Sequence, residues 1–241
     1  MKVNEIHVGN SIVSIETHPD YAHPVVIKKP ASPNPSSRLL LSLRREYEMT
    51  RTLDGVKGIR KAFKQTSIRN QPALILEYIE GENLRDRIAA KSLSLNEKLE
   101  IAVDLAQILK EVHQENVIHL DLNSKNILIG NKQGAIHIID FGSASCITGN
   151  VHQKVRPDQM LGTLPYISPE QTGRINRAVD ERSDLYSLGV VLYELMSGQL
   201  PFDSKDPMEL VHHHIARVPI SPSEVSSGIP EVLSAIILNY C

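Results

Sequence analysis

The stretch "VIHLDLNSKNILIG", residues 117–130, places polar side chains between runs of strand-forming apolar residues. These polar residues are His119, Asp121, Asn123, Lys125 and Asn126. Asp and Asn favour turns because their short side chains bond the neighbouring backbone. Taken alone, the stretch is therefore also typical of a plain hairpin loop.

A second stretch changes this interpretation. In "IHIIDFGSAS", residues 136–145, an apolar strand ends at Asp140. The intervening turn "NKQG", residues 131–134, allows the two strands to pair as a hairpin. Such a hairpin brings Asp140 to the same edge as Asp121 and Asn126. Because carboxylate and amide oxygens suit Mg²⁺, the sequence predicts a magnesium site at this edge.

Composition limits the class of protein. The chain has 241 residues, which corresponds to one large or two small domains. Its 26 basic and 28 acidic residues give no overall attraction to nucleic acid or to an anionic membrane. The two cysteines, Cys146 and Cys241, argue against a disulfide framework and favour the cytoplasm. We find neither a signal peptide nor an apolar run of the ~18 residues that span a bilayer, so no membrane segment is expected.

The periodicity of the chain changes near residue 80. Residues 1–80 are predicted to be mostly strand, including "PVVIKK" (24–29) and "PALILEYIEG" (72–81), with a single helix from about 38 to 53. Beyond Gly81, helical patterns dominate, beginning with a capping box in residues 94–116. We therefore expect a strand-rich lobe over 1–80 and a helical lobe over 81–241, with a ligand cleft between them.

Six motifs, in this order and at suitable spacing, resemble those of the eukaryotic-type protein kinases. They are "VVIKK" with Lys28, "RREYEMTRTL" with Glu46, His119-Leu120-Asp121 followed by Asn126, Asp140-Phe141-Gly142, "GTLPYISPE" (162–170) and "DLYSLG" (184–189) with Asp184. The resemblance implies an α+β, bilobal kinase-like fold. A small antiparallel β lobe carries one helix and is joined to a larger helical lobe.

The resemblance also implies ATP and Mg²⁺ as cofactors and gives roles to the motif residues. Lys28 binds the α- and β-phosphates, and Glu46 holds Lys28 in place. Asp121 accepts the proton of the substrate hydroxyl. Asn126 and Asp140 hold Mg²⁺. Lys29 and Glu48 are rival residues for the first two roles, but the family spacing favours Lys28 and Glu46.

Further positions follow from the same resemblance. Leu76 is expected to line the back of the adenine pocket, and the backbone from Glu77 to Ile79 to bond the adenine edge. Thr163, in the serine/threonine-type stretch "GTLPYISPE", is expected to bond Asp121.

Three departures from the family pattern stand out. The N-terminal segment has only Gly9 where the family carries a Gly-rich loop over the phosphates. Leu120 replaces the Arg that receives a phosphorylated activation loop, which argues against control by a phosphate at Thr148. Asn123 replaces the substrate-side lysine, and Lys125 is expected to substitute for it.

The leading hypothesis is a serine/threonine protein kinase that transfers the γ-phosphate of ATP to a protein hydroxyl. The alternative is a pseudokinase, a nucleotide-binding regulatory module. An aminoglycoside-type phosphotransferase shares H-x-D and a later Asn, but "GTLPYISPE" and "DLYSLG" disfavour it. The whole pattern resembles the N-terminal kinase-like domain of large bacterial and fungal signalling proteins that carry ATPase and histidine kinase modules, which implies further domains as partners.

The end of the chain carries one more expectation. In the family, Glu170 pairs with a buried Arg from a late helix, and no Arg follows Arg217 here. We expect Glu170 to lack a partner, and the helical lobe to be truncated, with its last helices missing. The helix that begins near Pro230 is expected to expose apolar residues.

Overall fold

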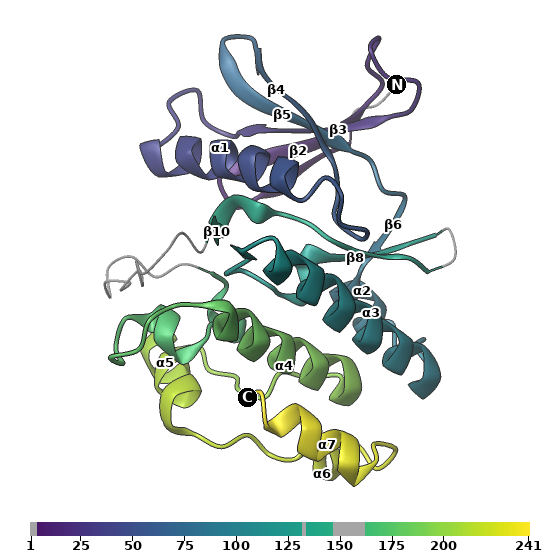
Figure 1. Ribbon diagram of the computed structural model, residues 1–241, viewed down its shortest axis with the longest axis vertical. Helices are drawn as coiled ribbons and strands as arrows, with labels where there is room; N and C mark the ends of the chain where they lie inside the picture. Colours follow the sequence, from purple (N-terminus) through teal and green to yellow (C-terminus); the bar gives the residue numbers. More distant parts are fainter. Residues whose placement is uncertain (1–3, 132–133, 147–161) are drawn as a thin grey trace.

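The structure is a computed structural model that describes residues 4–131, 134–146 and 162–241. One lobe is a five-stranded antiparallel sheet in the order β1-β2-β3-β5-β4. The strands are β1 Asn4–Val8, β2 Ser11–Glu16, β3 Val25–Pro30, β4 Ala62–Ile68 and β5 Gln71–Glu77. Helix α1 (Ser37–Thr52) lies against this sheet (Figure 1).

The central strand β3 is buried on both faces. Because successive side chains of a strand point to opposite faces, Val26 and Lys28 share the face that packs against α1, while Val25 and Ile27 belong to the other face. This alternation directs Lys28, and not Lys29, toward α1. The sequence preference for Lys28 as the inward lysine is confirmed.

Helix α1 presents a narrow inward stripe. Its N-cap is Ser36, whose hydroxyl accepts from the Leu39 N–H. The buried residues Leu43, Glu46 and Thr50 recur at spacings of three and four, so Glu46 faces the sheet together with the apolar side chains. The spacing of leucines in residues 39–43 would also place Leu40 on this inward face, but Leu40 is 38% exposed.

The other lobe is helical, as predicted. Its helices are α2 Leu84–Ala89, α3 Leu95–Gln114, α4 Glu181–Ser197, α5 Pro207–Ala216, α6 Pro222–Val225 and α7 Glu231–Leu238. Ser94 and Glu97 form the expected capping box of α3. Helix α4 is buried along most of its length and ends at Gly198, whose φ of +80° suits a glycine C-cap. In the residues that the structure describes, no helix combines the length and the apolar character that crossing a membrane requires.

Short strands line the junction between the lobes (Figure 1). Strands β8 (Ile127–Gly130) and β9 (Ile136–Ile138) form the predicted hairpin, with Ile127 opposite Ile138; turn residues 132 and 133 lie outside the described residues. Strand β6 (Gly81–Asn83) extends this hairpin, and β7 (Val117–Ile118) pairs with β10 (Ser145–Cys146). Among the described residues, the 3-10 helices η1 Ser124–Asn126 and η2 Phe141–Ser143 follow these strands, and η4 Leu164–Tyr166 and η5 Pro169–Thr172 pack against α4 and α5.

Helix α7 packs one side against the rest of the helical lobe. Ile237 is fully buried, whereas Val232 is 74% and Ile236 is 49% exposed. The expected exposure of apolar residues on this helix is confirmed. The predicted α+β fold, with an antiparallel sheet lobe carrying one helix and a larger helical lobe, is confirmed as well.

Candidate active site

A buried ion-pair cluster links β3, α1 and the segment after β9. Lys28 Nζ lies 2.7 Å from Glu46 Oε2 and 2.9 Å from Asp140 Oδ1. Glu48, the rival acid, instead pairs with Arg44 on the exposed side of α1. The structure therefore brings together three of the residues that the sequence singled out.

The charges of this cluster support one another. Burial opposes the charge of Lys28, but Asp140 and Glu46 together raise the pKa of its ammonium above the ordinary value. Burial likewise opposes the charge of Asp140, yet the charge and hydrogen bond of Lys28, with Arg60 nearby, hold the pKa of Asp140 at about 2. Burial raises the pKa of Glu46, and the charge of Lys28 offsets this rise only in part. Asp140 is thus ionised at neutral pH.

The segment that follows Asp140 is fixed on both sides. Asp140 has a φ of +66°, uncommon for a non-glycine residue, and its Oδ1 accepts from the Gly142 N–H. The Phe141 ring is buried and meets the His119 ring edge-on, with centroids 4.7 Å apart. The Ser42 hydroxyl of α1 donates to Gly142 O at 3.1 Å. Helix α1 therefore contacts the segment that positions Asp140.

The catalytic-loop motif is anchored by Asp184 of α4, as the resemblance implied. Asp184 is fully buried, and its carboxylate accepts from the His119 N–H at 2.7 Å and the Leu120 N–H at 2.8 Å. His113 Nε2 lies 2.9 Å from the same carboxylate. These bonds hold Leu120 at a φ of +63°, a conformation that bulky residues rarely adopt.

Asp121 is held by its neighbours at the mouth of the cleft. Thr163 Oγ1 donates to Asp121 Oδ1 at 2.7 Å, so the expected bond is present. The side-chain nitrogen of Asn126 donates to Asp121 O at 2.9 Å. Burial raises the pKa of Asp121, against the opposing effect of the Thr163 hydrogen bond, and a raised pKa makes its carboxylate a stronger base.

Asn123 is a site residue whose role the sequence did not reveal. It is buried, its Oδ1 accepts from the Lys125 and Asn126 N–H groups, and its Nδ2 donates to Asp121 O and to Thr163 Oγ1. The Lys125 side chain is exposed. Asn123 therefore organises the loop where the family carries a lysine. The catalytic role of Lys125 stays a prediction.

The expected adenine side of the cleft lies at the end of β5. Leu76 is buried in the cluster that joins the sheet to α1. Strand β5 ends at Glu77, whose N–H donates to Lys61 O at 2.9 Å. The chain then continues through Ile79 to β6, which begins at Gly81. The geometry is compatible with the predicted adenine contacts, which stay predictions.

A cleft of about 250 Å³ lies beside the charged cluster. It is lined by Lys28, Asp121, Asp140, Gly142 and the start of α1, and on the sheet side by Val8, Asn10 and Ser11. The residues over the cleft form a two-residue turn, since Val8 pairs directly with Ser11, and Gly9 takes a φ of +56°. The missing Gly-rich loop is thus replaced by a tight hairpin.

Asp140 lines this cleft and Asn126 bonds Asp121, and the two residues carry oxygen groups that fit Mg²⁺. Asn126 uses its amide nitrogen on Asp121, which leaves its amide oxygen as the group that can bind a metal. Asp140 is ionised and partly exposed to the cleft. One carboxylate and one amide oxygen, completed by phosphate and water, form a set of the kind that Mg²⁺ takes.

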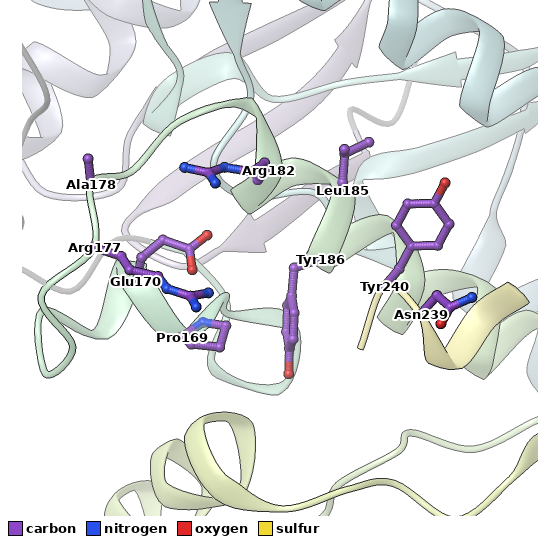
Figure 2. Close-up of a pocket in the computed structure, with 9 residues that line it drawn as sticks. All are labelled: Pro169, Glu170, Arg177, Ala178, Arg182, Leu185, Tyr186, Asn239 and Tyr240. Atoms are coloured by element: carbon purple, nitrogen blue, oxygen red, sulfur yellow. The ribbon is translucent and has the colours of Figure 1, made fainter. Parts of the chain in front are cut away.

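Glu170 lies outside this cleft, beside the N-terminal end of α4. Figure 2 shows it with Arg177 and Arg182 in a pocket of about 300 Å³ that also contains Tyr240. The Ser183 hydroxyl donates to Glu170 Oε1 at 2.6 Å. The expectation that Glu170 lacks a partner is therefore wrong, because the first turn of α4 supplies a hydroxyl donor.

Comparison with known proteins agrees with this geometry. A family model described as protein kinase domain matches residues 9–236. The chain is 34% identical over 169 residues to the serine/threonine-protein kinase PknB of Mycobacterium tuberculosis, and 35% identical over 176 residues to PknB of Mycobacterium leprae. It is 32% identical over 171 residues to the serine/threonine-protein kinase PksC of Streptomyces coelicolor.

The chain belongs to the protein kinase family, and its resemblance to the eukaryotic-type serine/threonine kinases is confirmed. The matched stretches cover 70%, 73% and 69% of this chain but only 26%, 28% and 30% of those three relatives. The chain thus spans less than a third of the length of the curated relatives that it matches. The likeness to large multi-domain signalling proteins stays a prediction.

Proposed function

We propose that this chain is the catalytic domain of a kinase that transfers the γ-phosphoryl group of ATP to a serine or threonine hydroxyl of a protein. The observation that carries the proposal is the cluster of Lys28, Glu46 and Asp140, of which Lys28 and Asp140 line the same cleft as Asp121. Phosphoryl transfer needs positioning and charge neutralisation more than covalent chemistry by the protein. This cleft offers both.

In this proposal the sheet lobe, residues 1–80, binds the nucleotide. Lys28, kept protonated by its two carboxylate neighbours, binds the α- and β-phosphate oxygens. Glu46 fixes the direction of the Lys28 ammonium. Leu76 packs against the adenine ring, and the backbone from Glu77 to Ile79 bonds its edge.

The helical lobe, residues 81–241, holds the acceptor and the metal. Asp121 accepts a hydrogen bond from the substrate hydroxyl, aligns it with the γ-phosphate and takes its proton, while Thr163 fixes the Asp121 carboxylate. Asn126 and Asp140 would hold Mg²⁺, which would supply positive charge to offset that of the ATP phosphates. The exposed Lys125 is then available to the acceptor side.

The serine/threonine class is supported by the Thr163–Asp121 bond and by the names of the matched relatives. The acceptor protein, and further domains of a larger signalling protein, are the partners in this proposal. Cys146 and Cys241 are free thiols, which supports a reducing, cytoplasmic setting.

Incubation of the purified chain with labelled ATP, Mg²⁺ and a basic Ser/Thr-containing acceptor tests the proposal. We expect phosphoserine or phosphothreonine from the wild type, and a loss of about 10²- to 10⁴-fold in Asp121→Asn, which removes the base. Equal, near-zero labelling of both proteins would reject transfer. If ATP then still raised the melting temperature, the regulatory-module alternative would replace it.

A further inference from the structure

Arg60 belongs to none of the motifs, yet its side chain reaches the centre of the charged cluster. It lies between the bridge at Ile59 and strand β4, and its side chain is only 11% exposed. Arginine keeps its charge in proteins, and a buried charge requires a partner. That partner is Glu46, with Arg60 Nη2 3.4 Å from Glu46 Oε1.

The two oxygens of Glu46 are therefore held by different cations. Lys28 bonds Oε2 at 2.7 Å, and Arg60 approaches Oε1 at 3.4 Å. Lys28 is shared with Asp140, so two cations balance two carboxylates in this cluster. Without Arg60, a single lysine faces two carboxylates, and Glu46 and Asp140 compete for it.

The backbone around Arg60 is tied to the strand that leads to Asp140. The Arg60 N–H donates to Ile138 O at 3.3 Å, and the Ile138 N–H donates to Gly58 O at 2.7 Å. Ile59 and Ile138 thereby form a short parallel bridge. Asp140 follows two residues later. Through its backbone Arg60 is fixed to the Asp140 segment, and through its side chain it reaches helix α1.

This double attachment matters because the usual external restraint is missing. Leu120, buried and uncharged, stands where the family carries the cation that receives an activation-loop phosphate. Helix α1 is instead held from within, by Lys28 and Arg60 on Glu46 and by the Ser42–Gly142 bond.

We propose that Arg60 is a positioning residue for phosphoryl transfer, which holds Glu46, and through it Lys28, in the arrangement that binds the ATP phosphates. The inference rests on the proposed kinase function. Arg60 acts only through Glu46, and this separates the proposal from a general structural role, because two residues that act as a unit show non-additive effects.

The test is a double-mutant cycle in the transfer assay, with Arg60→Met in the wild-type and in the Glu46→Gln background. We expect Arg60→Met to lower kcat/KM for ATP by about 10- to 100-fold in the wild type, as for loss of a charged hydrogen bond. In the Glu46→Gln background the further loss should be below about threefold. Arg60→Lys should restore part of the activity, since it keeps the charge.

Arg44→Met is the matched control, because Arg44 pairs with Glu48 on the exposed face of the same helix. It should leave kcat/KM unchanged. Equal losses from Arg60→Met in both backgrounds, or no loss in an active wild type, would overturn the proposal. If Arg60→Met does not fold, the same double-mutant cycle is measured with Arg60→Lys. The lysine side chain keeps the charge, but its shorter reach weakens the contact with Glu46.

The experiment also distinguishes failure of the kinase proposal from failure of the Arg60 proposal. If the wild type binds ATP but transfers no phosphate, the kinase proposal fails, and the rise in melting temperature caused by ATP becomes the measured quantity. Arg60→Met should then reduce that rise in the wild-type background and not in Glu46→Gln. An unchanged rise in both backgrounds would overturn the role of Arg60.

Discussion

The catalytic loop and the β1–β2 turn face the same cleft but are built in opposite ways. In the loop, His119 and Asn123 are buried, and their polar atoms bond the backbone of Asp121, Lys125 and, outside the loop, Ile139. In the turn, Val8 is 49% exposed, and Gly9 and Asn10 are exposed as well. The interior of the protein determines the geometry of the loop, whereas only strand pairing determines that of the turn.

The difference shows which part of the family's site this chain retains. The residues proposed to act on the substrate are held by bonds among distant segments: Lys28 bonds Glu46 of α1 and Asp140, and the Leu120 N–H bonds Asp184 of α4. The cover over the phosphates is reduced to a two-residue hairpin. We infer that charged side chains, more than backbone N–H groups, hold the nucleotide.

The largest effect is expected at the anchor of the loop. Asp184→Ala removes the acceptor of the His119 and Leu120 N–H groups and leaves both buried without a partner. The free energy of unfolding should fall by about 3–5 kcal/mol, measured by urea denaturation.

Asp180→Ala is the control, since Asp180 caps the same helix nearer the surface. Its loss should be about 1 kcal/mol. Equal, small losses for the two variants would mean that α4 does not anchor the loop.

Two glycine substitutions compare the regions directly. In Gly142→Ala the added Cβ meets the Ser42 hydroxyl of α1, and the helix or the Asp140 segment must shift; we expect the transfer rate to fall about 10- to 100-fold. In Gly9→Ala the added Cβ meets no neighbouring group within 4 Å. The only expected cost is the backbone strain of an alanine at a positive φ, about 1 kcal/mol. Steady-state kinetics of both variants give the comparison. A larger loss for Gly9→Ala would show that the turn matters more than the buried cluster.

The smallest effect is expected in the activation segment. Ser143→Ala, Ser145→Ala and Thr148→Ala should each leave the transfer rate within about twofold, because Leu120 offers no cation to a phosphate. Thr148 lies outside the described residues. A large loss in Thr148→Ala that an acidic residue restores would refute this expectation.

Much of the site was predictable because local rules fix it. The family spacing within VVIKK selects Lys28 over Lys29, and helical spacing together with the family's apolar face selects Glu46 over Glu48. The β8–β9 hairpin follows from two apolar runs separated by a polar turn. In each case the side chain's direction is set by its own strand or helix, so the sequence pattern is sufficient.

The residues that sequence reasoning missed depend on contacts between distant segments. Arg60 sits on a connection whose path is set by the bridge from Ile59 to Ile138, 79 positions along the chain. The inward direction of Asn123 depends on its bonds to Asp121 and Thr163, while Lys125, whose substitution for the substrate-side lysine stays a prediction, is exposed. Ser183 was missed as the partner of Glu170, because one hydroxyl in a helix turn gives no distinctive pattern. Strands of two or three residues, such as β6 and β7, are too short for a periodicity signal.

The central claim is that the cluster on Lys28 and Asp140 makes this cleft competent for phosphoryl transfer without a Gly-rich cover. The most direct test is a single-turnover measurement of phosphate transfer from labelled ATP by the wild type and by Asp140→Asn, with matched circular dichroism spectra. We expect measurable transfer by the wild type and a loss of at least about 10²-fold in the variant, because Asn lacks the charge that pairs with Lys28 and the metal. Equal transfer rates for the two folded proteins would contradict the claim.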